Sequence, residues 1–147
     1  MSASVLLHDK QFNPFLSARQ IAEKVKELAT AISRDYPGQK PLFLVVLNGA
    51  FVFAADLFRS LSIEAEITFI KRASYRGTAS SGKLTTAIGL EEVVSGRHVI
   101  LVEDILDTGR TLFEFMPRLE EQQPASLRIV ALLRKPEALH YPVQVEY

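Results

Sequence analysis

One stretch, residues 99–112, constrains the fold of this chain more than any other part of it. It begins with four apolar residues, a pattern typical of a central parallel strand because both faces of such a strand are buried. The acidic pair Glu103-Asp104 follows, and a short polar loop then leads into a segment with helical periodicity. A strand, a loop and a helix in this order build anion sites, since the helix N-terminus presents free N–H groups. We therefore expect a ligand site at the carboxyl edge of an open α/β sheet.

The remaining sequence alternates between predicted strands and helices. Ser17 and Gln20 form a capping-box pattern ahead of apolar residues at helical spacing, and this helix should end near Tyr36-Pro37-Gly38. The other predicted elements are strands at 42–47, 63–69, 97–102 and 127–133, a helix at 50–61, and a helix from Thr111 that is interrupted or kinked at Pro117. This alternation predicts the α/β class, with a parallel doubly wound sheet flanked by helices and a Rossmann-like or flavodoxin-like core. Residues 72–89 are polar instead, which favours a mobile loop with a function.

The composition limits the kinds of partner. The 147 residues fit a single domain over 1–147, and 17 basic residues balance 17 acidic ones. No global field therefore attracts nucleic acid or an acidic membrane, and any anion site must be local. The absence of cysteine excludes disulfides, thiolate zinc sites and a Cys nucleophile. The first residues lack a signal-peptide pattern and no apolar run reaches membrane-spanning length, so we expect a cytoplasmic protein without a nucleic acid or membrane partner.

Residues 99–112 resemble the phosphoribosyl-pyrophosphate (PRPP) signature of type I phosphoribosyltransferases. Three further segments, 45–57, 71–75 and 132–136, are similar to the hypoxanthine-guanine branch of that family. The resemblance implies a type I phosphoribosyltransferase fold and a transferase of purine salvage. Such an enzyme uses Mg²⁺ to move the 5-phosphoribosyl group from PRPP to hypoxanthine or guanine, which gives IMP or GMP and pyrophosphate. The resemblance also implies a homodimer or homotetramer.

The loop at 107–111 is the candidate site for the 5′-phosphate of PRPP. Its backbone N–H groups and two threonine hydroxyls would converge on one anion. An ordinary strand-to-helix turn would also explain Asp107 and Thr111, although it leaves the acidic pair unexplained. By resemblance, Asp107 is the general acid or base toward purine N7, and Ile105 lies against the base. The candidate phosphate ligands are Asp107, Thr108, Gly109, Arg110 and Thr111.

Glu103 and Asp104 are the candidate ribose and metal ligands. Adjacent in a strand, they should point to opposite sides. By resemblance, they bind the two ribose hydroxyls, partly through hydrated Mg²⁺, and their charge can stabilise a ribosyl cation. The alternative is that two acids at a strand end are only solvated edge residues.

Three other positions match the resembled family. Asn48-Gly49 matches its pyrophosphate loop, whose peptide bond is often cis, although many members carry Lys or Arg in place of Asn48; an ordinary Asn-Gly turn is the alternative. Ser74 and Tyr75 match a flexible lid that closes over PRPP and excludes water, with plain disorder as the alternative. Lys135 matches the lysine that recognises the C6 oxygen of the purine, which would favour hypoxanthine or guanine over adenine.

The chain differs from the resembled family at its carboxyl end, and other functions of the same fold are open. The resembled family continues with a hood segment that stacks on the purine, and this chain reaches Tyr147 without it, so we expect the hood to be absent from residues 1–147. A non-catalytic regulator of the same fold, which senses PRPP or nucleotide, is the main alternative function. The absence of a Lys/Arg stripe argues against a regulator that binds nucleic acid. The 107–111 loop argues against a third possibility, a receiver-type domain with an acidic pocket.

Overall fold

The computed structural model describes residues 4–72, 84–86 and 94–147. Its centre is a five-stranded sheet with the order β5-β4-β3-β6-β7. The strands are β3 (Leu42–Leu47), β4 (Glu66–Arg72), β5 (Leu84–Thr86), β6 (His98–Leu106) and β7 (Ser126–Arg134). β4, β3, β6 and β7 are mutually parallel, and β5 adds an antiparallel edge. The predicted parallel α/β sheet is confirmed, and β5 is a strand within the segment where only a loop was expected.

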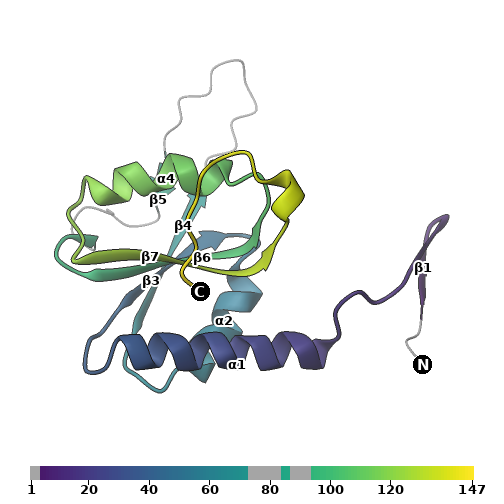
Figure 1. Ribbon diagram of the computed structural model, residues 1–147, viewed down its shortest axis with the longest axis horizontal. Coiled ribbons are helices and arrows are strands. Elements are labelled where there is room, and N and C mark those ends of the chain that lie inside the picture. The colour runs from purple at the N-terminus through teal and green to yellow at the C-terminus, as the bar shows by residue number, and fades with distance from the viewer. Residues whose placement is uncertain (1–3, 73–83, 87–93) are drawn as a thin grey trace, which may run out of the picture.

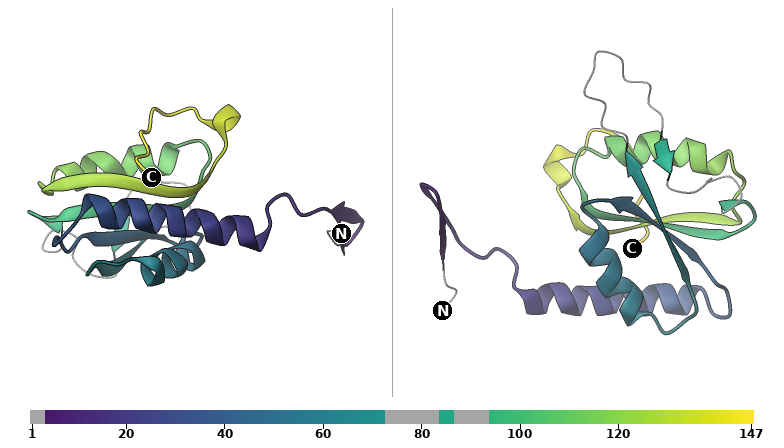
Figure 2. Two further views of the ribbon diagram at one scale, coloured as in Figure 1. Left: turned by 60° about the horizontal axis from the view of Figure 1, so that its bottom comes forward. Right: turned by 180° about the vertical axis from the view of Figure 1, so that it is seen from behind.

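Helices cover both faces of the sheet (Figure 1). α1 (Ala18–Asp35) and α2 (Phe51–Ser60) lie on one face, and α4 (Arg110–Glu120) lies on the other (Figure 2). Successive side chains along β3 point into two different cores. Phe43 and Val45 face α1 and α2, whereas Leu42 and Leu44 face α4. This double burial explains the unbroken apolar run that marked β3 as a buried strand.

The helix boundaries follow the local signals in the sequence. Ser17 caps α1, and both hydrogen bonds of the predicted capping box with Gln20 are present. The helix continues through Pro117 to Glu120, so the expected interruption at Pro117 is wrong, whereas the expected kink there stays a prediction. Leu112, Phe115 and Leu119 on α4 are buried against the sheet, and this packing offsets the hydrogen bond that a proline removes.

Two strands have a boundary that differs from the prediction by three residues or more. β4 begins at Glu66 rather than residue 63, because its pairing with β3 begins at Leu42 opposite Glu66. β6 continues past Val102 to Leu106, because β7 pairs with it up to Leu106 opposite Arg134. β3 pairs with β6 only as far as Val102. The acidic pair therefore lies inside β6, where β6 pairs with β7 but no longer with β3.

Two segments extend beyond the sheet. A hairpin of β1 (Val5–Leu7) and β2 (Lys10–Phe12) stands apart from the body at the N-terminal end (Figure 1). At the other end, residues after β7 pass through a short 3₁₀ turn, η1 (Pro136–Ala138), and return across the sheet. Among the described residues, no helix has the length and apolar character needed to span a membrane.

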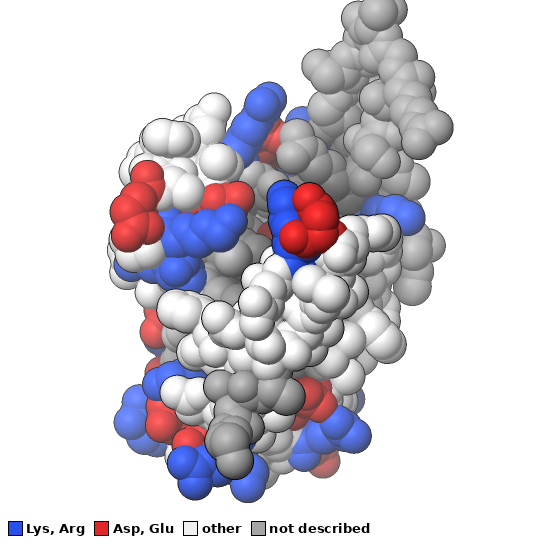
Figure 3. Space-filling model, turned by 90° about the vertical axis from the view of Figure 1, so that its right-hand side faces the viewer, with Lys and Arg blue, Asp and Glu red and all other residues white. Residues whose placement is uncertain are grey.

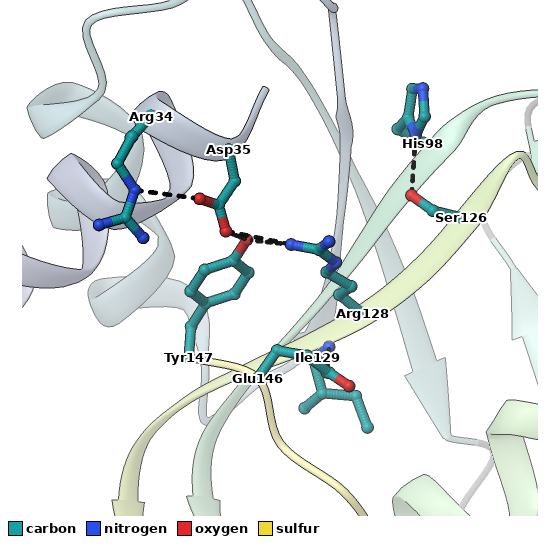
Figure 4. A network of polar contacts seen from close by, with 8 residues as sticks. All are labelled: Arg34, Asp35, His98, Ser126, Arg128, Ile129, Glu146 and Tyr147. Carbon is teal, nitrogen blue, oxygen red and sulfur yellow. Dashed lines mark hydrogen bonds and ion pairs between the residues drawn. The ribbon is translucent and has the colours of Figure 1, made fainter. Parts of the chain in front are cut away.

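A polar network fastens the end of this returning segment to α1 (Figure 4). The Tyr147 hydroxyl donates to Asp35 Oδ2 at 2.6 Å, and Arg128 Nη1 donates to both Tyr147 Oη and Asp35 Oδ2. The guanidinium of Arg128 also lies 5.4 Å from the ring centre of Tyr36. Burial, followed by the hydrogen bond with Asp35, raises the pKa of Tyr147 to about 12. This network holds residues 146–147 beside β7.

Candidate active site

The loop between β6 and α4 forms the floor of a cavity of about 150 Å³ that residues 103–112 line. Gly109 precedes the first turn of α4 with φ of +81°, a left-handed conformation that side chains disfavour. The N–H of Arg110 donates to Thr108 Oγ1 at 3.3 Å. Within the part of the chain that the structure describes, the N–H groups of Gly109 and Thr111 have no hydrogen-bond acceptor. Free donors at a helix N-terminus favour an anion, as the sequence predicted.

Glu103 and Asp104 lie above this loop on β6, at the point where β3 no longer pairs with it. Burial raises the pKa of Glu103 to about 8, and hydrogen bonding with Asp104 and its charge act in the same direction. Asp104 Oδ1 also accepts the N–H of Ile105 at 2.9 Å. The expectation that the two side chains point to opposite faces of β6 stays a prediction, and they lie close enough for Asp104 to act on the pKa of Glu103. At neutral pH, Glu103 is therefore mainly protonated when no cation is present.

The loop after β3 comes against the acidic pair. A Cβ atom added to Gly49 would lie 2.5 Å from Asp104 Oδ2, so only glycine fits there. This loop contains a cis peptide bond without proline, between Leu47 and Asn48, as the resemblance implied for a pyrophosphate loop. The Asn48 carbonyl accepts the N–H of Phe51 at 3.3 Å, which closes the turn into α2. The structure thus brings the candidate pyrophosphate loop and the candidate ribose ligands together.

Lys135 and Asp107 form an ion pair across the ends of β7 and β6. The distance from Lys135 Nζ to Asp107 Oδ2 is 3.5 Å, and both side chains are about half exposed. The backbone N–H of Lys135 donates to the Leu106 carbonyl at 2.9 Å, which fixes its position beside the loop. Ile105, the other predicted base contact, is partly buried on β6 between the acidic pair and this ion pair. Lys135 and Ile105, the predicted purine-binding residues, therefore lie at the same edge of the site as Asp107, the predicted catalytic residue.

The residues present suit a magnesium ion that also binds phosphate. Mg²⁺ usually takes one or two carboxylates from the protein and completes its shell with water and phosphate oxygens. Glu103 and Asp104 provide such a pair. In residues 4–72, 84–86 and 94–147, no group of three or more His, Cys, Asp or Glu side chains could hold a metal without a ligand's help. A pair of carboxylates fits a magnesium ion whose remaining ligands are water and phosphate oxygens.

One contact of the phosphate loop was not predicted from the sequence. Residues 139–143 lie against the phosphate loop: a Cβ atom at Gly109 would be 3.0 Å from Leu139 Cδ1 and 3.3 Å from Val143 Cγ2. The only sequence signal was the alternate spacing of Leu139, Tyr141 and Val143, and it names no partner. The predicted lid residues Ser74 and Tyr75 lie outside the described residues.

Charged side chains are mixed on the side of the molecule that Figure 3 shows. Lys and Arg alternate with Asp and Glu there, and they do not gather into a large basic area. In the described residues, ion pairs such as Arg110 with Glu114 and Lys135 with Asp107 also bring opposite charges together. A nucleic-acid surface needs a continuous basic face, so this side of the molecule does not favour one.

Comparison with known proteins places the chain among enzymes. Residues 13–144 match the family model of the phosphoribosyl transferase domain. The chain is 38% identical to the hypoxanthine-guanine phosphoribosyltransferase of Lactococcus lactis, over 90% of this chain and 72% of that protein. A crystal structure of the hypoxanthine-guanine phosphoribosyltransferase of Bacillus anthracis superposes with a TM-score of 0.80 at 39% identity, covering 90% of this chain and 77% of that one. A mutant hypoxanthine phosphoribosyltransferase of Trypanosoma cruzi, complexed with the product IMP, gives a TM-score of 0.79 at 31% identity and covers 99% and 75%.

Proposed function

The chain belongs to the hypoxanthine-guanine branch of the phosphoribosyltransferase family, and we propose that its residues 1–147 form one domain that transfers 5-phosphoribosyl from PRPP to hypoxanthine or guanine. One observation carries this proposal: the phosphate loop, the acidic pair and the Lys135–Asp107 ion pair lie along one edge of the sheet. This edge offers an anion site at one end and two polar groups for a base at the other. The T. cruzi relative, solved with the product IMP, supports the same substrate class.

The phosphate loop would hold the 5′-phosphate of PRPP. The free N–H groups of Gly109 and Thr111 and the hydroxyls of Thr108 and Thr111 are the proposed donors, and the dipole of α4 favours the negative charge. The guanidinium of Arg110 is paired with Glu114, so its contact with the phosphate would use the backbone N–H, which would exchange Thr108 Oγ1 for a phosphate oxygen. Fixing the phosphate places the anomeric carbon over Glu103 and Asp104.

The acidic pair would bind the ribose hydroxyls and the metal. Magnesium, when bound, supplies positive charge to the pyrophosphate oxygens. A cation in the site would favour the ionised form of Glu103, which burial and Asp104 otherwise disfavour. In their ionised forms, both carboxylates stabilise the positive charge that the ribose ring gains as the bond to pyrophosphate breaks.

The loop at Asn48 and Gly49 would contact the pyrophosphate. Gly49 has no side chain, so its backbone can approach an anion, and its contact with Asp104 holds it beside the metal ligands. Asn48 offers no positive charge, but Lys71 pairs in register with Leu47 and puts a basic residue on the neighbouring strand. The proposed lid residues Ser74 and Tyr75 follow that strand, and in this proposal they exclude water from the reacting centre.

Asp107 and Lys135 would recognise and activate the base. Lys135 donates to the C6 oxygen of hypoxanthine or guanine, whereas the C6 amino group of adenine offers no acceptor there. Purine N9 forms the new bond to the anomeric carbon, the bond to pyrophosphate breaks with its electron pair on oxygen, and the proton on N7 passes to Asp107. Ile105 packs against the ring.

A homodimer or homotetramer is also proposed, and the exposed Phe51 and Val52 on α2 support such an interface.

An assay with defined bases tests this proposal. The protein is incubated with PRPP, Mg²⁺ and each of hypoxanthine, guanine and adenine, and nucleotides are separated by chromatography. IMP or GMP should accumulate with an equal amount of pyrophosphate, and AMP should not. Absence of nucleotide with every base would contradict the proposed activity and favour the regulatory alternative, which retains PRPP binding without turnover.

A further inference from the structure

The peptide that joins Thr108 to Gly109 is held from outside the site by residues 139–143. The Thr108 carbonyl accepts two hydrogen bonds, from the N–H of His140 at 3.0 Å and from the N–H of Tyr141 at 3.1 Å. In a trans peptide the C=O and the following N–H point in opposite directions. The N–H of Gly109 must therefore point away from residues 139–143.

The same residues also press on Gly109 itself. A Cβ atom at this position would lie 3.0 Å from Leu139 Cδ1, 3.1 Å from the Tyr141 carbonyl oxygen and 3.3 Å from Val143 Cγ2. Gly109 is buried, although its neighbours Thr108 and Arg110 are exposed. The loop is therefore free on the cavity side and packed on the other side.

Residues 139–143 are in turn fixed by packing that involves no ligand. Leu139 and Val143 pack against the core on the α4 face. The Tyr141 ring lies 5.2 Å from the ring of Phe113 on α4. Four residues after Val143, Tyr147 is hydrogen-bonded to Asp35 on α1, which ties the chain beyond the segment to the opposite face. The segment is thus anchored to both faces of the fold, and the loop rests on it.

We propose that residues 139–143 are a positioning element for the 5′-phosphate site. By holding the Thr108 carbonyl and packing on Gly109, the segment orients the Gly109 N–H toward the phosphate before PRPP arrives, so that little ordering is needed on binding. This inference rests on the proposed function. It adds that a segment beyond Lys135, which touches no substrate, sets the affinity for the phosphate end of PRPP.

A pair of variants separates this role from general stability. Leu139→Ala combined with Val143→Ala removes the packing on Gly109, and Val145→Ala is the matched control because Val145 packs on the same core outside residues 139–143. Calorimetry then measures binding of magnesium-PRPP and of magnesium-pyrophosphate, which lacks the 5′-phosphate. We expect PRPP to bind about tenfold more weakly to the double variant, the size of a lost charged hydrogen bond, and pyrophosphate and the control to be unaffected.

Two results would overturn the inference: unchanged PRPP affinity in the double variant, or an equal loss of pyrophosphate affinity. Wild-type protein that binds pyrophosphate but not PRPP would contradict the proposed function instead. Hydrogen exchange on the wild-type protein gives a test that needs neither a stable variant nor a ligand. The N–H groups of His140 and Tyr141 should be protected in the free protein, and exchange at the rate of an exposed loop would also overturn the inference.

Discussion

Lys135 Nζ lies 3.5 Å from Asp107 Oδ2, although the two residues belong to different strand ends. The sheet brings them together, because Leu106 on β6 pairs in register with Arg134 on β7 and the next residue of each strand follows at the same edge. In the proposed reaction these side chains contact O6 and N7, which lie on the same edge of a purine. The ion pair therefore holds Lys135, which would recognise the C6 oxygen, next to Asp107, which would accept the N7 proton.

Asp107→Asn should slow turnover far more than it weakens PRPP binding. A proton-transfer residue acts mainly in the transition state, so we expect kcat to fall on the order of 10²–10⁴-fold. Steady-state kinetics and calorimetry with magnesium-PRPP give the two numbers. A fall in PRPP affinity as large as the fall in kcat would make Asp107 a phosphate ligand instead.

Lys135→Met should affect the purine and spare PRPP. Removing one charged donor to the C6 oxygen should raise KM for hypoxanthine about tenfold or more, while PRPP affinity stays within about twofold. Lys135→Arg is the matched control, because it keeps a charged donor and should recover part of the hypoxanthine affinity. A variant that loses PRPP affinity and hypoxanthine affinity alike would argue against a purine-specific role.

Gly49→Ala should destabilise the fold through Asp104. The added methyl carbon would approach Asp104 Oδ2 to 2.5 Å, and crowding of this kind costs about 1–3 kcal/mol. Asp104→Ala in the same chain removes the clash and should recover most of that loss of stability, although PRPP binding stays weak. Urea unfolding of the two single variants and the double variant measures the coupling. Additive losses would mean that Gly49 and Asp104 do not touch in solution.

The pKa of Glu103 predicts how stability depends on pH. Its pKa of about 8 in the folded protein lies above the ordinary glutamate value of 4.5, so the folded protein binds this proton more tightly than the unfolded chain. The stabilisation is complete below the unfolded pKa and is lost as pH rises toward 8. Glu103→Gln should therefore flatten the decline in unfolding free energy between about pH 5 and about pH 8, in urea titrations without Mg²⁺. Parallel curves for the variant and the wild type would refute the raised pKa.

Tyr147→Phe should cost stability and leave the active site intact. The variant loses the hydroxyl that Asp35 and Arg128 share, which is worth about 1 kcal/mol, and it keeps the aromatic ring. The unfolding free energy should fall by that amount at neutral pH, and PRPP affinity should not change. A large loss of PRPP affinity would show that the end of the segment, and not only residues 139–143, positions the phosphate loop.

Local signals in the sequence predicted the elements that depend on local physics. The capping box at Ser17 and Gln20 placed the start of α1, and buried apolar runs placed β3 and β7. The end of β6 could not be read in this way, because two carboxylates look like the end of a strand. Its extension to Leu106 depends on pairing with β7, which is a tertiary property.

In the candidate site, too, the residues could be predicted from the sequence but their tertiary contacts could not. Motif resemblance identified Gly49, Asp104, Asp107 and Lys135 singly, but not their contacts. The contact between Gly49 and Asp104 joins β6 to the loop after β3, and only the parallel register of these strands brings the two together. The packing of residues 139–143 on Gly109 was not predicted, because the spacing of apolar residues indicates that they are buried but not which residues they contact.

In the proposed complex, one sheet edge holds both the phosphate and the base of the same nucleotide, and a crystal structure with bound IMP decides whether it does. We predict that the phosphate lies within hydrogen-bond distance of the N–H groups of Gly109 and Thr111, and that the purine C6 oxygen lies within hydrogen-bond distance of Lys135 Nζ. IMP bound with its phosphate elsewhere, or with its base away from Lys135 and Asp107, would contradict the account.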